Sequence, residues 1–292
     1  MELIKKLIPL ILIISTLFSV VSCNNGKGDE GNTDPSRYTV TVLNPFGKPV
    51  SGVTVYVHKD GSEDYNICTL PALTDNNGTA TFTLDPSGEY SVQLSGVPEV
   101  YSASLGYTRA DRYAFDSNNI IVKLDANVGY TPDTYRVGDY IADFTILDVK
   151  GNSYGLYSLL KEKKVVVINF WFYGCSPCAA EFPALNAAYS EHKGNVEVLA
   201  VNDYPRETLE HVLGYEEYRG FKLDMPLFKT EYGSEVSLSR FPSNGYPTTV
   251  IIDRYGVISL VHVGYVSSVS VWNGLFEYYT SDSYNGDPYT DF

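Results

Sequence analysis

The chain has 292 residues, 44% of them hydrophobic, which is enough for two ordinary domains with separate cores. Its formal net charge of −14 repels phosphate backbones and excludes nucleic acid as an expected partner. The aromatic fraction is 14%, with 25 tyrosines, a composition typical of β-rich domains.

Residues 1–22 have the layout of a secretory signal. Lys5 and Lys6 precede an apolar run over residues 7–21 that is too short to span a membrane comfortably. The segment ends in the letters VVSC, which resembles a bacterial lipobox with its cysteine at Cys23. The resemblance implies that Cys23 is lipidated, and that the rest of the chain is exported and anchored to a bacterial membrane. An uncleaved membrane anchor is the alternative, and it too leaves the rest of the chain exported.

Residues 23–36 are polar and Gly-rich, as in a flexible tether. Residues 37–125 are predicted to form an all-β domain, because short alternating segments are separated by turns that contain Gly, Pro and Asn. The expected strands are 38–43, 53–57, 79–84, 90–94 and 120–124. This pattern favours a β-sandwich.

Two stretches of this domain, NPFGKPVSGVTVYV and LTDNNGTATFTLDPSGEYSVQL, carry a resemblance. They are similar to the carboxypeptidase-regulatory-like and Cna-B-like Ig-type sandwiches of surface proteins. The resemblance implies an Ig-like sandwich that serves as a spacer or as a docking module for a partner or glycan. The fold alone does not decide between these two roles.

Residues 126–136 form an expected linker, and the pattern changes at residue 137. Strands then alternate with helical stretches up to residue 280, which predicts an α/β domain with parallel pairing. The strands are expected at 144–147, 164–172, 196–201, 248–252 and 257–263, and the helices at 178–191, 206–218 and 266–279. Residues 281–292 are expected to be a polar, frayed tail.

The four cysteines divide by position. With Cys23 lipidated, the other three allow one disulfide, and proximity favours Cys175 with Cys178. Cys68 is expected to behave as a small buried hydrophobe, with the role of partner thiol for the active pair as the alternative. Zinc also binds CxxC motifs, but the sequence supplies no second CxxC or paired His, so no metal site is expected.

The motif WFYGCSPC, residues 171–178, is expected where a buried strand ends and a helix begins. A helix N-terminus carries unpaired N–H groups and a partial positive charge, which stabilise a thiolate at Cys175. Pro177 lacks an N–H and fits the first helical turn. The expected chemistry is attack of the Cys175 thiolate on a substrate disulfide, followed by attack of Cys178 on the mixed disulfide.

The C-terminal domain resembles the thioredoxin superfamily, and most closely its TlpA-like, redoxin-type extracytoplasmic members. The resemblance rests on VGDYIADFTILDVKGNSYGLYSLL, VVVINFWFYGCSPCAAEFPAL and GYPTTVIIDRYGVI. It implies a thioredoxin-like fold with a mixed central sheet, and a thiol-disulfide oxidoreductase without a cofactor that acts on protein thiols and disulfides. Pro247 matches the family's cis-proline, which leaves the backbone of Tyr246 free to pair with a substrate strand.

The same resemblance assigns expectations to two more positions. Asn169 stands where cytosolic thioredoxins hold a buried Asp, and an Asn cannot take up a proton. Glu181 follows Cys178 by three residues on the same helix face, where the family uses an acid to tune the thiols or relay a proton. The alternative for Glu181 is a favourable charge in the first helical turn.

A substrate-binding rim is expected around the cysteine pair, formed by Trp171, Tyr173, Ser176, Pro177, Tyr246 and Pro247. Phe172 is a further aromatic candidate, and core packing is the alternative for both Trp171 and Phe172.

The expected function is reduction of protein disulfides outside the cytoplasm, for example in cytochrome c maturation or surface thiol repair, with electrons from a membrane thiol reductant. Two alternatives stay open. A surface scaffold lipoprotein would use the fold only for binding, although binding needs no paired thiol. A peroxiredoxin-like peroxidase would need a Thr three residues before its reactive cysteine, and Phe172 occupies that position.

Overall fold

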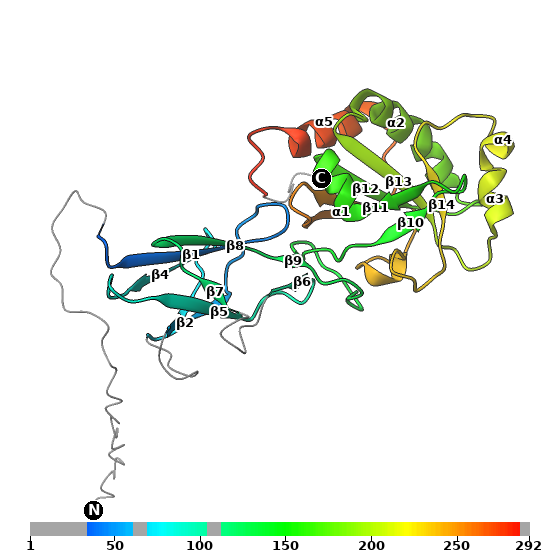
Figure 1. The fold of residues 1–292 in the computed structure, drawn as a ribbon. Coiled ribbons are helices and arrows are strands. Elements are labelled where there is room, and N and C mark those ends of the chain that lie inside the picture. Colours follow the sequence, from blue (N-terminus) through cyan, green and yellow to red (C-terminus); the bar gives the residue numbers. More distant parts are fainter. Residues whose placement is uncertain (1–33, 61–68, 104–111, 287–292) are drawn as a thin grey trace, which may run out of the picture.

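The computed structural model describes residues 34–60, 69–103 and 112–286. The signal segment 1–22, Cys23, most of the tether and Cys68 lie outside the described residues. Two halves are visible, with strands β1 to β9 in one and the helices with the remaining strands in the other (Figure 1). No helix among the described residues is both long and apolar enough to cross a membrane.

The N-terminal half is built from two sheets with a shared interior. Strand β1 (Arg37–Leu43) lies between β4 (Thr79–Thr83), which is antiparallel to it, and β8 (Asn119–Lys123), which is parallel to it. The second sheet has the antiparallel order β3 (Ala72–Leu73), β2 (Thr54–Lys59), β5 (Tyr90–Ser95), β7 (Tyr113–Ala114). Alternate residues of these strands are buried in one common core. A short pair, β6 (Tyr101–Ser102) with β9 (Asp125–Ala126), follows toward the other half.

The C-terminal half has the predicted mixed sheet, with five strands; the expected strand 144–147 lies outside it, and residues 227–229 supply an edge strand that was not predicted. Its order is β14 (Leu227–Lys229), β13 (Val196–Asn202), β12 (Val165–Phe170), β15 (Thr248–Asp253), β16 (Ile258–Val263). The first three strands and β16 run in the same direction, and β15 runs antiparallel to them. Every residue of β12 and β13 is buried, because both faces of the sheet are covered. A hairpin of β10 (Thr145–Leu147) and β11 (Ser153–Gly155) precedes the sheet.

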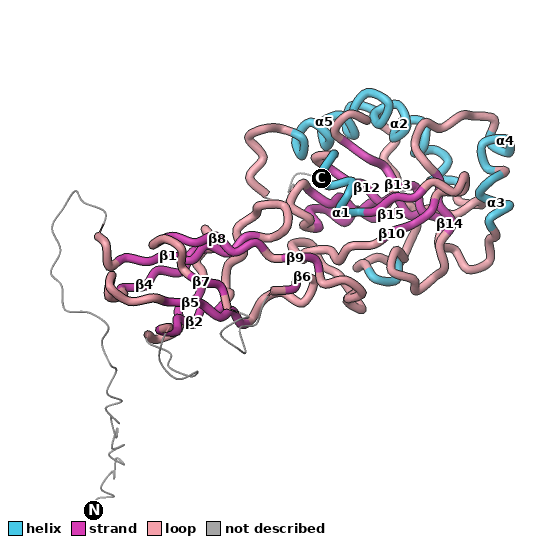
Figure 2. Tube along the Cα trace, in the orientation of Figure 1, coloured by secondary structure: helices cyan, strands magenta, loops and turns pink. Residues whose placement is uncertain are grey.

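Helices cover the two faces of this sheet unequally (Figure 2). Helices α2 (Ser176–His192) and α5 (Val269–Thr280) pack on one face. Helix α1 (Leu156–Glu162) packs on the other face. The hydrophobic core between α1 and this face continues into the N-terminal half. The alternation of β12 therefore decides which side chains meet α2, and Asn169 is one of them.

The two halves are joined by a turn of the N-terminal half rather than by a free linker. The side-chain amide of the buried Asn44 donates to the carbonyl of Tyr255 at 2.7 Å and to the Tyr101 hydroxyl at 3.1 Å. The ring of Phe46 packs edge-on against Tyr157 of α1, with 4.8 Å between the ring centroids. One hydrophobic core thus runs through both halves.

The expected helix 206–218 is wrong, because two short helices stand in its place. Helix α3 (Leu209–Leu213) begins with a capping box between Thr208 and His211. Helix α4 (Tyr215–Arg219) follows directly. Gly214 separates the two, and glycine is a poor helix former.

The C-terminal helix begins at Val269, three residues later than predicted. Val266 is held outside it, because its N–H donates to Glu181 and its carbonyl accepts from the indole N–H of Trp272. The predicted fraying is also wrong for residues 281–286: Tyr284 is buried, and its hydroxyl donates to the Asp253 carboxylate at 2.8 Å. The predicted linker is likewise anchored, since the buried ring of Tyr135 stacks on Phe241.

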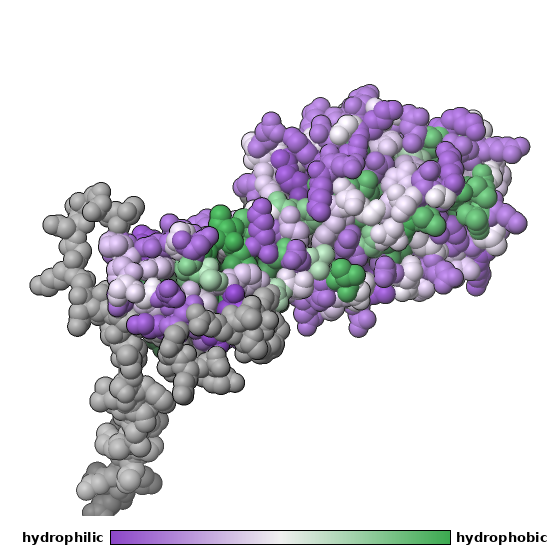
Figure 3. All heavy atoms as spheres, viewed as in Figure 1, coloured by the Kyte–Doolittle hydropathy of each residue, from purple (hydrophilic) through white to green (hydrophobic). Residues whose placement is uncertain are grey.

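The surface of the C-terminal half in Figure 3 is mostly hydrophilic. Hydrophobic residues gather near β8, where Ile121 is 66% exposed, and near α3, where Leu209 and Leu213 are exposed (Figure 3).

We expect Phe46→Ala to lower the free energy of unfolding of the C-terminal half, although Phe46 belongs to the N-terminal half. Loss of the half-buried ring removes the contact with Tyr157 and costs about 2 kcal/mol. Urea titration followed by tryptophan fluorescence checks this, because both tryptophans, Trp171 and Trp272, lie in the C-terminal half. Leu73→Ala, at a side chain 63% exposed, is the control. An unchanged midpoint in Phe46→Ala would mean that the halves unfold independently.

Candidate active site at the start of helix α2

Cys175 and Cys178 form a disulfide at the point where β12 gives way to α2. Cys175 is the N-cap of the helix, and its sulfur accepts the backbone N–H of Cys178 at 3.1 Å. Ser176 and Pro177 are exposed between them, and Pro177 in the first turn leaves no hydrogen bond unmade. Cys175 is 2% exposed and Cys178 is fully buried, so any solvent access in this disulfide state is through Cys175. The predicted strand–turn–helix setting is confirmed.

Glu181 lies one turn after Cys178 and is fully buried. One carboxylate oxygen accepts the side-chain amide of Asn169 at 2.7 Å, and the other accepts the N–H of Val266 at 2.7 Å. Burial raises the pKa of Glu181 to about 7, against the opposing effect of these two hydrogen bonds. The alternative of a favourable charge in the first helical turn does not fit, because Glu181 lies beyond the first turn of α2.

Asn169 lies on β12 beneath the helix and links three elements. Its amide nitrogen also donates to the Thr249 hydroxyl on β15 at 3.0 Å. Its side-chain oxygen has no hydrogen-bond partner within the described chain. The ionisable group on this side of the cysteine pair is therefore the carboxyl of Glu181, since an amide exchanges no proton at neutral pH.

The proline loop follows the prediction in its backbone. The peptide bond between Tyr246 and Pro247 is cis, and Pro247 is buried while Tyr246 is half-buried. The Tyr246 hydroxyl donates to the carboxylate of Asp203 at 2.7 Å.

The aromatic rim differs from the prediction at Trp171. That ring is fully buried between Phe182 and Tyr215, because it is an inward-facing continuation of β12, so it belongs to the core. Phe172 is half-buried and stacks on Tyr204, with 4.9 Å between ring centroids.

Tyr173 is also half-buried, and its backbone is held on both sides. Its N–H donates to the Glu207 carboxylate at 2.8 Å, and its carbonyl accepts from the Arg219 guanidinium at 3.1 Å. The ring stacks on Tyr218 with 4.5 Å between centroids. Sequence reasoning missed the partners of these two loop aromatics, namely Tyr204, Glu207, Tyr218 and Arg219. The available signal was the density of aromatic residues between 204 and 221.

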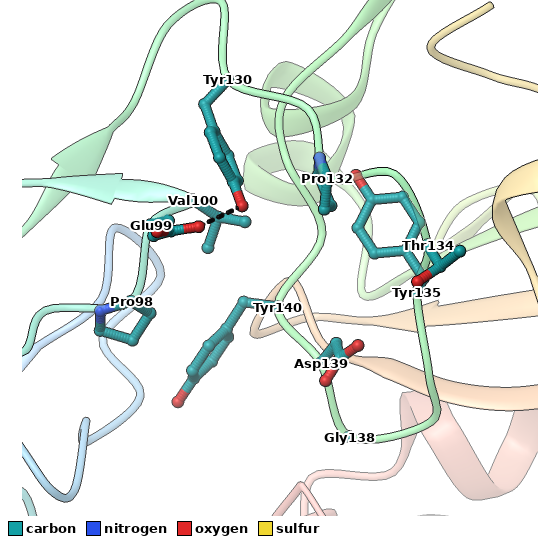
Figure 4. Close-up of a pocket in the computed structure, with 10 residues that line it drawn as sticks. All are labelled: Pro98, Glu99, Val100, Tyr130, Pro132, Thr134, Tyr135, Gly138, Asp139 and Tyr140. Carbon is teal, nitrogen blue, oxygen red and sulfur yellow. Dashed lines mark hydrogen bonds between the residues drawn. The ribbon is translucent and has the colours of Figure 1, made fainter.

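A separate cavity of about 290 Å³ lies at the junction of the two halves (Figure 4). Residues 98–100 line one side and residues from 130–140 line the other, with the Tyr130 hydroxyl donating to Glu99 at 2.6 Å. None of its lining residues belongs to the cysteine motif or the proline loop. The cavity is therefore not part of the candidate active site.

The sequence profile of the AhpC/TSA family matches residues 137–261. The thiol-disulfide oxidoreductase ResA of Geobacillus kaustophilus is 31% identical over 155 residues, which cover 50% of this chain and 84% of that protein. The chain belongs to the ResA-like thiol-disulfide oxidoreductases. ResA of Halalkalibacterium halodurans is 28% identical over 183 residues, covering 62% of this chain and 90% of that one. A solved structure, the exposed lipoprotein thioredoxin Etrx1 of Streptococcus pneumoniae, is 27% identical, covers 47% of this chain and 99% of its own, and has a TM-score of 0.40.

As a ResA-like protein the chain is an oxidoreductase of thiols and disulfides. The geometry fits this chemistry at one point in particular. The N–H that reaches the Cys175 sulfur would stabilise negative charge on it once the disulfide is reduced.

We expect the stability of the disulfide form to fall as pH rises through neutrality. The folded pKa of Glu181 is about 7 against an ordinary value of 4.5, so the folded state keeps this proton to higher pH than the unfolded state. The stabilisation is therefore fully present below about pH 4.5 and lost as pH passes 7, a change of about 3 kcal/mol. Urea unfolding between pH 4.5 and 8 measures it.

Glu181→Gln should flatten this pH dependence, because the neutral amide does not ionise. Glu191→Gln, on the exposed face of the same helix, is the matched control and should keep the wild-type slope. Equal slopes in wild type and Glu181→Gln would rule out Glu181 as the titrating group.

Proposed function

We propose that this chain is a membrane-anchored, extracytoplasmic enzyme that reduces protein disulfides through Cys175 and Cys178. The observation that carries the proposal is the position of Cys175 as the N-cap of α2, with its sulfur accepting the Cys178 N–H. This position favours a thiolate over a thiol, and the thiolate is the nucleophile in disulfide exchange.

The proposed reaction begins with the reduced pair. The Cys175 thiolate attacks one sulfur of the substrate disulfide, forms a mixed disulfide and expels the other substrate sulfur as a thiolate. Cys178 then loses its proton and attacks the Cys175 sulfur, which releases the second substrate thiolate and regenerates the enzyme disulfide. Two electrons pass to the substrate, and a thiol reductant must return them to the enzyme.

Glu181 supports this cycle as the proton acceptor for Cys178. Its pKa of about 7 lets it exchange a proton near neutral pH, and it lies one helical turn from that cysteine. Substrate lies across Tyr173, Ser176 and Pro177 in this proposal, and its backbone pairs beside Tyr246 and Pro247.

The N-terminal part of the proposal follows the expected domain boundaries. Cys23 carries the lipid, residues 23–36 are the tether, and residues 37–125 form an Ig-type sandwich. Residues 126–136 connect this sandwich to the thioredoxin-like domain at 137–280. The substrates are then exported proteins, as in cytochrome c maturation or surface thiol repair, and the donor is a membrane thiol reductant on the periplasmic or cell-surface side.

Reduction of peroxides is the second candidate, and the AhpC/TSA profile match favours it. Phe172 weakens this candidate, because it stands where that family uses a Thr to activate its cysteine.

Wild type should accelerate the reduction of insulin disulfides by dithiothreitol, while Cys175→Ser should not exceed the uncatalysed rate. Loss of the attacking sulfur leaves Cys178 buried and without its partner. We therefore expect the enzyme-dependent rate of insulin reduction to decrease by at least about 100-fold. The turbidity of the released insulin chain is the readout. If wild type and Cys175→Ser behave alike, a scaffold that only binds replaces the enzyme.

Cys178→Ser separates the two candidate reactions. With Cys178 absent, the mixed disulfide with insulin should accumulate and be visible on a non-reducing gel. A wild-type enzyme that consumes hydrogen peroxide faster than it reduces insulin would favour the peroxidase.

Cys23→Ala should release the protein from the membrane fraction of the bacterium that expresses it. The variant lacks the cysteine to which the lipid anchor would be attached. Cys68→Ala is the control, since it removes a cysteine outside the proposed lipid site. Fractionation followed by immunoblotting measures the distribution. Retention of Cys23→Ala on the membrane would favour an uncleaved apolar anchor.

A further inference from the structure

The segment between β13 and β14 supplies partners to both aromatic residues that precede the cysteine motif. Phe172 stacks on Tyr204, and Tyr173 stacks on Tyr218. This segment also contains Asp203, a fully buried carboxylate that the redox chemistry does not use.

Asp203 holds three donors at once. One oxygen accepts the Ser237 hydroxyl and the N–H of Leu238, each at 2.7 Å, and the other accepts the Tyr246 hydroxyl at 2.7 Å. Three donors satisfy a buried carboxylate and fix the directions of the groups that donate to it. Asp203 thus sets the direction in which the Tyr246 side chain points.

The Tyr246 ring connects this carboxylate to the cysteine pair. It packs edge-on against Phe172, with 5.4 Å between the ring centroids, and Tyr204 lies on the same cluster at 6.1 Å from Tyr246. The carbonyl of Phe172 accepts the N–H of Cys175 at 3.0 Å. Phe172, Tyr204 and Tyr246 are each half-buried, and we refer to them as the aromatic wall.

We propose that Asp203 is a positioning residue that holds Tyr246 in the aromatic wall, and that this wall selects polypeptide disulfides with an aromatic or aliphatic side chain next to the reacting cysteine. The inference rests on the proposed reductase function and names its substrate class. Phe172 belongs to the turn that holds the Cys175 N–H, so the wall offers partly exposed ring surface on that turn, which an apolar side chain of a polypeptide can cover. A small disulfide without such a side chain gains nothing from it.

The test uses the full, pre-reduced protein in single turnovers against mixed disulfides with thionitrobenzoate. Three probes share this leaving group: a peptide with Phe before its cysteine, the same peptide with Gly there, and mercaptoethanol. Attack of Cys175 on the sulfur of the probe releases coloured thionitrobenzoate, and Cys178 then displaces the probe as a thiol. The half-saturating concentration and the saturated rate are measured for each probe.

Tyr246→Phe removes only the hydroxyl that Asp203 holds. We expect the half-saturating concentration of the Phe peptide to rise about fivefold, the size expected for loss of one hydrogen bond, with the saturated rate within about twofold. The Gly peptide and the mercaptoethanol probe should change by less than about twofold. Tyr232→Phe is the matched control, because that side chain lies outside the aromatic wall, is 57% exposed and makes no side-chain hydrogen bond among the described residues, and it should match wild type for all probes.

Asp203→Asn supplies the conservative variant, since its amide still offers the Tyr246 hydroxyl a partner. It should keep the preference for the Phe peptide, whereas Asp203→Ala should lose it if that variant folds. An unchanged half-saturating concentration in Tyr246→Phe, or equal losses for all three probes, would overturn the inference. If wild type releases thionitrobenzoate no faster than Cys175→Ser with any of the three probes, the proposed reductase function is overturned instead.

Discussion

The hydrogen bond from the Cys178 N–H to the Cys175 sulfur is the constraint on which the site depends. It requires that a helix begin within one turn of a cysteine, and that the preceding strand be fixed. The sheet meets both demands, because β12 is its central strand and is covered on both faces. The Cys175 sulfur is therefore held next to a fully buried strand, although it lies at a turn.

Glu181 extends this arrangement from the helix into two other elements. Its carboxylate connects α2 to β12 through Asn169, and to the entrance of α5 through Val266. Burial removes water from this carboxyl group, and the desolvation disfavours its charged form. The same desolvation gives the group a proton affinity suited to exchange at neutral pH, so the stability cost and the proposed role as proton acceptor have one physical origin.

Local pattern was sufficient to predict the cysteine pair and its strand–turn–helix setting, whereas the mixed sheet and the proline loop were implied by the family resemblance. It could not separate Trp171 from Phe172, because neighbouring residues of an apolar run point to opposite sides and both sides are apolar here. The contact between Asp203 and Tyr246 joins residues 43 positions apart in the chain, and no local pattern encodes it. The split of the expected helix at Gly214 was readable from the low helix propensity of glycine.

The shared core of the two halves fixes the distance between the cysteine pair and the start of the described chain. Strand β1 starts at the end of the N-terminal half that is remote from the thioredoxin-like half (Figure 1). Because Asn44 and Phe46 tie the halves together, folding rather than chain flexibility fixes the separation between that starting point and Cys175. The strand-built half is thus a rigid standoff of set length. The disulfide therefore lies at a set distance from the start of β1.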